Sequence, residues 1–249
     1  MSAEKAKLGF LSNNMLKLIA AALMVCDHAG MLLFPEVPVL RYIGRLAFPI
    51  FAYLIAEGAK YTRNRFRYFL TMASFAAVIQ VGYSVFTQSL EMSVMVTFTL
   101  SLAIIFAIDF FKKEIFEEEL SLPRLIGGAA LTFVAVLAAA MLGILADIDY
   151  HFTGCLLPVF PALLTTPRVK APPKVFRILD TKWCRVAALA VGMLLLVADH
   201  GVLQWYGYCA LPLLLLYSEK RGKWKMKYFF YVFYPLHLVV LYVIAAVIK

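Results

Sequence analysis

The chain has 249 residues, of which 63% are hydrophobic and 16% are charged. Soluble domains average about 45–50% apolar and roughly 25% charged residues, so this composition excludes an ordinary water-soluble fold. The formal net charge of +9 does not indicate a nucleic-acid-binding protein, because the basic residues lie between apolar runs and do not gather on one water-facing surface. We therefore expect an all-α, polytopic integral membrane protein.

Nine apolar runs follow one another along the chain. They cover residues 15–34, 39–59, 67–87, 91–111, 123–146, 152–166, 183–199, 202–217 and 228–248. A bilayer core about 30 Å thick is crossed by about 20 helical residues, so this pattern predicts about nine transmembrane helices in a single membrane-embedded domain, residues 1–249. The runs that begin at 152, 183 and 202 are short, and tilted, partly inserted or re-entrant segments are alternatives for them.

The charges between the runs predict how the helices are oriented. The N-terminal stretch and the even-numbered connections hold most of the basic residues: Lys5, Lys7, Lys17, Lys60, Arg63, Arg65, Arg67, Lys112, Lys113, Arg124, Arg168, Lys170, Lys174, Arg177, Lys182, Arg185, Lys220, Arg221, Lys223, Lys225 and Lys227. The odd-numbered connections hold Glu36, Arg41, Glu91, Asp147, Asp149, His151, Asp199 and His200. Because Lys and Arg accumulate in cytoplasmic connections, we expect the N-terminus inside and the C-terminus outside a plasma membrane or cell inner membrane.

Two local patterns lie outside the spans. Residues 112–120 mix charged and apolar side chains and predict an amphipathic helix on the cytoplasmic surface. The four cysteines, at positions 26, 155, 184 and 209, form no C-x-x-C pair. This spacing indicates neither a disulfide framework nor a zinc site, and we expect no metal.

We single out five ionisable residues within the predicted spans as functional candidates, because charge is costly at membrane depth. They are Asp27, His28, Arg45, Glu57 and His237. His28 and Arg45 are each expected about 9 Å below the outer surface, so the two can meet, while His237 is expected roughly 15 Å deep. Asp27 is rotated from His28 by about 100° on the helix, so one of the two is expected to line a cavity and the other to contact a neighbouring helix.

Each of these residues also has a purely structural interpretation. Asp27 with Arg45 could form a buried salt bridge. His237, which follows Pro235, could make a hydrogen bond between helices at a kink. Glu57 is expected near the cytoplasmic end of its span, where its carboxylate could reach water.

The functional interpretation is acyl transfer. A neutral imidazole is a good general base, so His28 could take the proton of an acceptor while Arg45 stabilises the oxyanion that forms on the thioester. The basic residues that follow Glu57 could bind the phosphates of a nucleotide-bearing donor. These residues are Lys60, Arg63, Arg65 and Arg67.

Several segments resemble the TraX family over nearly the whole chain. They are LKLIAAALMVCDHAGML at 16–32, LRYIGRLAFPIFAYLIAEGAKYTRN at 40–64, DYHFTGCLLP at 149–158, LYSEKRG at 216–222 and KYFFYVFYPLHLVVLY at 227–242. The namesake of that family acetylates the N-terminus of pilin, so the resemblance implies a membrane acetyltransferase that uses acetyl-CoA. The acceptor would be a pilin-type protein amine or a cell-surface glycan at or beyond the outer face.

On this resemblance the predicted catalytic residues are His28, Asp27, Arg45 and His237. The donor acetyl-CoA is assigned to Glu57 and to the four basic residues after it. Two other classes remain open. In a proton-coupled transporter, Asp27, His28 and His237 would form a proton relay. A structural or assembly protein of a secretion or conjugation system would need the buried ionisable residues only for stability.

Overall fold

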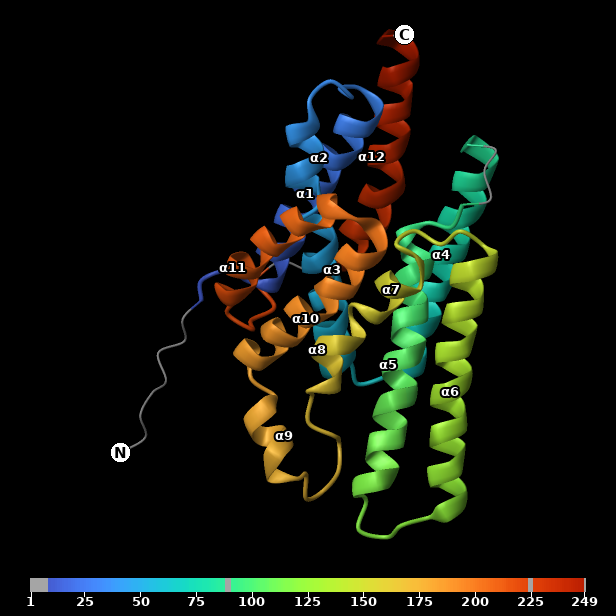
Figure 1. The fold of residues 1–249 in the computed structure, drawn as a ribbon, viewed down its shortest axis with the longest axis vertical. Coiled ribbons are helices and arrows are strands. Elements are labelled where there is room, and N and C mark those ends of the chain that lie inside the picture. Colours follow the sequence, from blue (N-terminus) through green and yellow to red (C-terminus); the bar gives the residue numbers. More distant parts are fainter. Residues whose placement is uncertain (1–8, 88–90, 224–225, 249) are drawn as a thin grey trace. The chain divides into compact units, whose positions relative to one another are not determined.

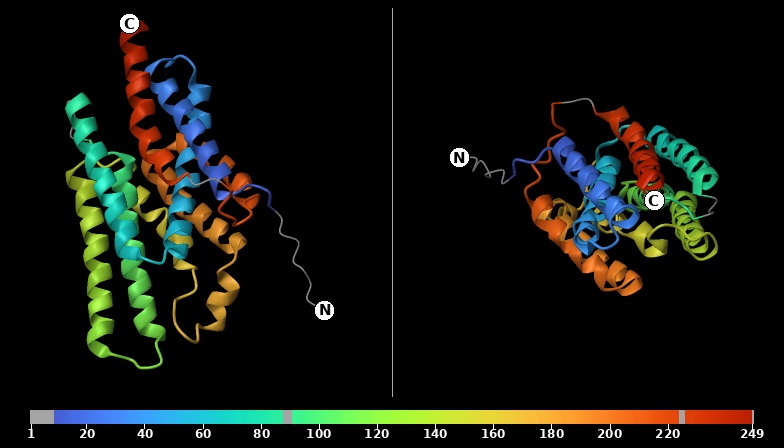
Figure 2. Two further views of the ribbon diagram at one scale, coloured as in Figure 1. Left: turned by 180° about the vertical axis from the view of Figure 1, so that it is seen from behind. Right: turned by 90° about the horizontal axis from the view of Figure 1, so that it is seen from above.

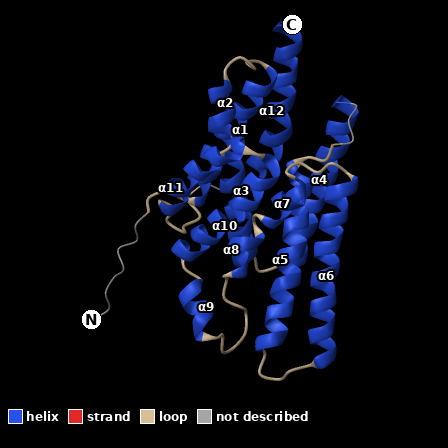
Figure 3. Ribbon diagram, in the orientation of Figure 1, coloured by secondary structure: helices blue, strands red, loops and turns tan. Residues whose placement is uncertain are grey.

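The computed structural model describes residues 9–87, 91–223 and 226–248. All regular structure in these ranges is helical (Figure 3), apart from two isolated β-bridges. The chain divides into two compact units, and the path of the chain through both is shown in Figure 1. The first unit contains the chain up to Leu54 and from Val202 onward, and the second contains Ile55–Gly201.

The first unit is built around α1 (Asn13–Leu32), which contacts α2 (Pro38–Gly44) and α12 (Lys227–Ile248). The remaining elements are the first half of α3 (Ala47–Tyr61), η1 (Val202–Cys209) and α11 (Ala210–Leu215). Two proline positions shape these helices. Pro38 begins α2, where a missing N–H costs nothing, whereas Pro235 lies inside α12 and removes one backbone hydrogen bond there.

The start of α1 is fixed by its cap and by a second segment of the same unit. The Ser12 hydroxyl accepts a hydrogen bond from the backbone N–H of Met15, which satisfies one of the unpaired donors of the first turn. Leu11 pairs with Tyr217 in a parallel bridge, and the Asn13 N–H donates to the Lys220 carbonyl at 2.8 Å. These contacts fix the position from which α1 enters the unit.

In the second unit, α4 (Arg65–Thr87), α5 (Val94–Phe116) and α6 (Leu122–Leu145) run side by side, with α5 in contact with both others (Figure 2). The short helices α7 (His151–Leu156) and α8 (Val159–Leu163) pack on α5 and on α10 (Lys182–His200), and α9 (Lys174–Leu179) precedes α10. Buried hydroxyls join these helices, since Ser101 donates to the Cys155 carbonyl at 2.8 Å.

Six of the helices in the described part of the chain are long and apolar enough to cross a membrane. They are Asn13–Leu32, Pro38–Tyr61, Arg65–Val85, Val94–Phe116, Leu122–Leu145 and Lys182–His200. The apolar stretches His151–Leu163, Val202–Leu215 and Val232–Ile248 are shorter. The all-helical fold class and the multi-pass character are thus confirmed, whereas the count of nine spans and the orientation stay predictions.

Helix α6 shows the apolar surface that a bilayer requires. Phe133, Ile144 and Leu145 are 67%, 78% and 73% exposed, and side chains of this kind are stable at a surface only in contact with lipid or a partner. The run at 183 forms a helix of 19 residues because the polar residues Lys182 and His200 extend it at both ends. Its length therefore fits a full span.

The prediction of an amphipathic surface helix over residues 112–120 is wrong. Helix α5 continues to Phe116, and residues 117–121 are not helical. Lys112 and Glu114 are buried. The Lys112 ammonium donates to the Leu163 carbonyl at 2.5 Å, where it satisfies the end of α8. A cation at a helix C-terminus is favourable, so tertiary packing has made this charge an internal contact.

Candidate active site

The carboxylate of Asp27, on α1, is held by two arginines in the first unit. Arg45 donates from Nη2 and Nε to Oδ1 at 2.7 and 3.2 Å, and Arg41 donates from Nη1 to Oδ2 at 2.8 Å. The two arginines are four residues apart, which places them on one face of the same helical segment. The side chains of Asp27 and Arg45 are 13% and 9% exposed. Two guanidinium groups around one carboxylate leave the cluster with an excess of positive charge.

Glycines allow α1 and α2 to approach closely enough for these contacts. A Cβ atom at Gly44 would lie 2.3 Å from the Cβ of Asp27, and one at Gly30 would lie 2.8 Å from the Cβ of Leu40. Both distances are shorter than any real contact between carbon atoms. The sequence Gly44-Arg45 therefore has two functions, since the glycine admits the Asp27 side chain and the arginine binds it.

His28, the next residue on α1, contacts a second histidine from α12. Its Nδ1 lies 2.9 Å from Nε2 of His237, and the ring centroids are 5.1 Å apart. His237 is buried, and its Nδ1 lies 3.0 Å from the carbonyl oxygen of Phe233 in the preceding turn of α12. A row of hydrogen bonds therefore runs from the α12 backbone through both imidazole rings.

This row determines which nitrogen of His28 is basic when both rings are neutral. The Phe233 carbonyl only accepts hydrogen bonds, so Nδ1 of His237 carries a proton and its Nε2 is an acceptor. Nδ1 of His28 must then be the donor of the 2.9 Å hydrogen bond. Nε2 of His28 keeps its lone pair, which is the form that a general base needs.

The structure brings together four of the five residues singled out within the predicted spans: Asp27, His28, Arg45 and His237. Asp27 and His28 contact different helices, as their rotation on α1 predicts. The structural interpretations also describe real contacts, because Asp27 does pair with Arg45 and His237 does bond between helices. Sequence reasoning missed Arg41, although its spacing of four residues from Arg45 was a usable signal.

The predicted donor-binding residues lie in the second unit, where Glu57 forms a buried ion pair and Lys60 a partly exposed one. Glu57 and Arg185 are both 2% exposed and pair through Oε1 and Nη1. The Lys60 ammonium lies 2.8 Å from Asp180, whose other oxygen accepts from the Thr166 N–H at 3.0 Å. The expectation that Glu57 reaches water is wrong, because α10 brings Arg185 against it.

The other predicted donor-binding residues follow α3. Arg65 pairs with Asp109 at 2.7 Å, whereas Arg63 and Arg67 are exposed. Arg168 donates to the Lys60 carbonyl at 2.6 Å, so a cation also binds the C-terminal end of α3. The basic connection thus contains side chains engaged with carboxylates and two arginines that face outward.

Comparison with known proteins identifies the family of this chain and a similar protein. The sequence model described as TraX protein matches residues 12–245. A protein named as a probable fimbrial assembly protein FimC, serogroup H1, from Dichelobacter nodosus is similar to this chain. It is 26% identical over 258 residues, which cover 91% of this chain and 92% of that protein. No solved structure matches the chain.

Proposed function

Since this chain belongs to the TraX family, we propose that it is a membrane-embedded acetyltransferase that moves an acetyl group from acetyl-CoA to an amine or hydroxyl acceptor. The observation that carries the proposal is the hydrogen-bonded pair of His28 and His237 beside the Asp27 cluster. The segments that carry the family resemblance around Asp27, Gly44 and Pro235 supply these residues. Asp27, His28, Arg45 and His237 all lie in the first unit.

The proposed reaction uses Nε2 of His28 as the base. This nitrogen takes the proton of the acceptor amine or hydroxyl as the acceptor atom forms a bond to the acetyl carbonyl carbon. The C–S bond of the thioester then breaks, its electron pair leaves with the sulfur, and the sulfur takes up the proton held by His28. The excess positive charge of Arg41 and Arg45 stabilises the oxyanion formed in between.

His237 is assigned a positioning function. Its Nε2 accepts the hydrogen bond from Nδ1 of His28, which fixes the ring orientation and the reactive tautomer. Outer partners of this kind change activity by about 10–100-fold when they are removed. Asp27 acts in the same way on the two arginines, since it holds both guanidinium groups in one arrangement.

The donor phosphates are assigned to the basic residues after α3. Arg63 and Arg67 are exposed, and arginine binds phosphate through paired N–H donors. Lys60 and Arg65 already pair with carboxylates, so we assign them an electrostatic contribution. Glu57 is assigned an indirect function through Arg185, because its carboxylate is buried in that pair.

We assign a pilin-type amine as the first acceptor to test. The resemblance implies this substrate, and the name of the similar Dichelobacter nodosus protein refers to fimbrial assembly. With the predicted orientation, the acceptor would reach the site at or beyond the outer face of the membrane. A glycan hydroxyl would use the same base, since only the atom that loses the proton differs.

The test is transfer of labelled acetyl from acetyl-CoA to a peptide with a pilin N-terminus, using the purified protein in nanodiscs. We expect His28→Ala to abolish transfer. His237→Leu should lower kcat by about 10–100-fold with little change in KM, because it removes the partner of the base. His237→Gln should restore part of that loss, since its amide oxygen accepts the same hydrogen bond. Full activity of His28→Ala would refute the assignment.

A proton-coupled transporter is the second candidate, favoured by one observation. Nδ1 of His28 and Nε2 of His237 are 2.9 Å apart, a distance over which a proton is exchanged directly. Liposomes that contain the protein would then show substrate flux driven by a pH gradient, without turnover of acetyl-CoA. If calorimetry detects no binding of acetyl-CoA or CoA to the folded protein, the acetyltransferase assignment is rejected and the transporter assignment remains.

A further inference from the structure

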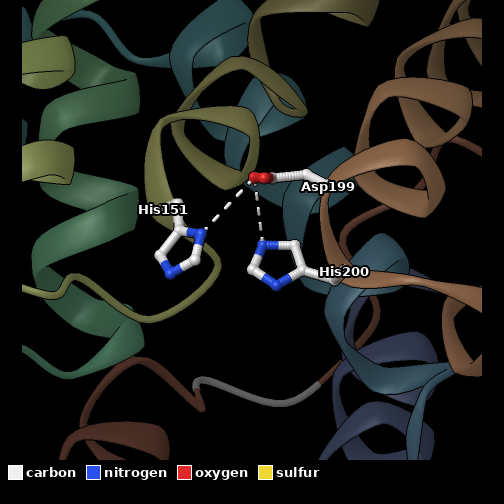
Figure 4. A group of neighbouring side chains, drawn as sticks. All are labelled: His151, Asp199 and His200. Atoms are coloured by element: carbon white, nitrogen blue, oxygen red, sulfur yellow. Dashed lines mark ion pairs between the residues drawn. The ribbon is translucent and has the colours of Figure 1, made fainter.

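Outside the proposed active site, the second unit brings two histidines against one carboxylate. His151 begins α7, and Asp199 and His200 end α10 (Figure 4). Nδ1 of His151 and Nε2 of His200 lie 3.5 and 3.4 Å from the same oxygen of Asp199. One potential ligand atom from each residue lies within 4.8 Å of the others.

We propose that His151, Asp199 and His200 bind a divalent transition-metal ion such as Zn²⁺. Bonds of about 2.0–2.1 Å to a tetrahedral ion place neighbouring ligand atoms about 3.3–3.4 Å apart. The two nitrogen–oxygen distances already match this spacing.

The surroundings of these ligands are those of a metal site. The Thr153 hydroxyl donates to Asp199 at 2.7 Å and thereby orients the carboxylate. Nε2 of His151, the nitrogen directed away from Asp199, lies 3.7 Å from the carboxylate of Asp147. Metal-binding histidines commonly use their second nitrogen in this way, and metal-binding carboxylates commonly accept an outer hydrogen bond.

An unsatisfied nitrogen of His200 supports the metal site independently of the distances. Its Nε2 is buried and makes no hydrogen bond within the part of the chain that the structure describes. A buried polar atom without such a partner is costly, and a bound cation would satisfy this one. The same nitrogen is the one directed at Asp199.

The loop that presents His151 is held in one conformation before any ion binds. Asp147, Tyr150 and His151 have φ angles of 42°, 62° and 49°, which non-glycine residues seldom adopt. Met92 pairs with this loop, since the Asp149 N–H donates to its carbonyl at 2.8 Å. Thr97 donates to the Asp149 carbonyl at 2.7 Å. These contacts fix the loop in the geometry that brings His151 to Asp199.

The donor set selects the class of ion. Two imidazoles and one carboxylate suit Zn²⁺ and neighbouring transition metals, whereas Ca²⁺ and Mg²⁺ prefer all-oxygen sites. Three protein ligands leave a fourth position for water or another ligand. This proposal departs from the expectation of no metal, which was based on cysteine spacing alone. A second Asp-His pair at positions 199–200, after the first at 27–28, was a signal in the sequence.

The test is calorimetric titration with ZnCl₂ of chelator-treated protein, purified without a histidine tag. The chain has four histidines, so two matched double variants remove two each. We expect one ion per chain for the unaltered protein and for H28A/H237A. In H151A/H200A the affinity should fall by at least about 100-fold. The visible spectrum of bound Co²⁺ should show a four-coordinate site in the first two proteins.

Two further variants keep the test decisive if the double variant fails to fold. Asp199→Asn preserves side-chain volume but removes the charge. Thr153→Val removes the outer hydrogen bond to Asp199 and the contact of the same hydroxyl with the Tyr150 carbonyl, and we expect about 10–100-fold weaker binding for it. Absence of Zn²⁺ binding to the unaltered protein would overturn the proposal. Unchanged affinity in H151A/H200A or Asp199→Asn, or loss of binding in H28A/H237A, would also overturn it. The activity assay does not enter this test.

Discussion

The ion pair of Glu57 and Arg185 gives the most direct test of how the second unit is stabilised. Both side chains are 2% exposed, so neither charge is screened by water. Removal of one partner from such a pair costs about 3–5 kcal/mol, because an uncompensated charge stays buried. Replacement of both partners by apolar side chains of similar size is often neutral or stabilising.

We therefore expect Arg185→Met to destabilise the protein by about 3–5 kcal/mol, and Glu57→Gln by less, because Asp180 lies 3.4 Å from Nε of Arg185 and still compensates its charge. The double variant Glu57→Leu/Arg185→Met should lose less stability than either single variant. The free energy of unfolding would be measured in detergent micelles by denaturant titration, with helical circular dichroism as the signal. A double-mutant cycle built with Glu57→Leu as the first single variant isolates the coupling between the two side chains.

The control is the exposed Arg63, also in the second unit. Arg63→Met removes one positive charge from the same protein, and a surface change of this kind should alter stability by less than about 0.5 kcal/mol. Additive single effects in the cycle would refute the reasoning, because they would mean that the two charges do not stabilise each other. A neutral effect of Arg185→Met would refute it equally.

Three further predictions concern other parts of the molecule. Gly44→Ala places a Cβ atom 2.3 Å from the Cβ of Asp27 and should lower both thermal stability and acetyl transfer. The control is Gly127→Ala, whose Cβ meets nothing within 4 Å and which should be neutral or stabilising by up to about 1 kcal/mol. Equal melting temperatures of the two variants would contradict this prediction. Lys112→Met removes the ammonium at the end of α8 and should cost about 1–3 kcal/mol in denaturant titration, while Lys113→Met, at an exposed position, should cost almost nothing. An odd number of transmembrane helices places the C-terminus outside, so a C-terminal alkaline phosphatase fusion should be active and a C-terminal fluorescent protein fusion should be dark. The reverse result would reject the predicted outer C-terminus.

The helical, multi-pass character could be predicted from composition because lipid imposes a strong constraint. A backbone in hydrocarbon must satisfy its own hydrogen bonds, so long apolar runs become helices. Each of the nine predicted runs does coincide with one helix or with two consecutive ones. The sequence could not determine which of the shorter helices cross the bilayer, because hydropathy alone does not separate a span from a partly inserted segment.

Depth and rotation along α1 predicted much of the candidate site. Asp27 and His28 were expected to face different partners, as the structure shows. Arg45 was expected at the depth of His28, and the structure pairs it with Asp27. The sequence did not predict that His237 would be the partner of His28. The two residues are 209 positions apart, and only the contact of α1 with α12 brings them together.

What the sequence determined by itself was the class of protein, the helical segments and the ionisable residues that interrupt apolar runs, because each depends on local hydrophobicity and helical periodicity. The tertiary structure decided the partners: Arg41 for Asp27, Arg185 for Glu57, and Asp199 for both His151 and His200. The physical reason is that a charge must find its compensating group within a few ångströms. Which groups lie that close to a charge in the folded protein depends on helix packing and not on sequence separation.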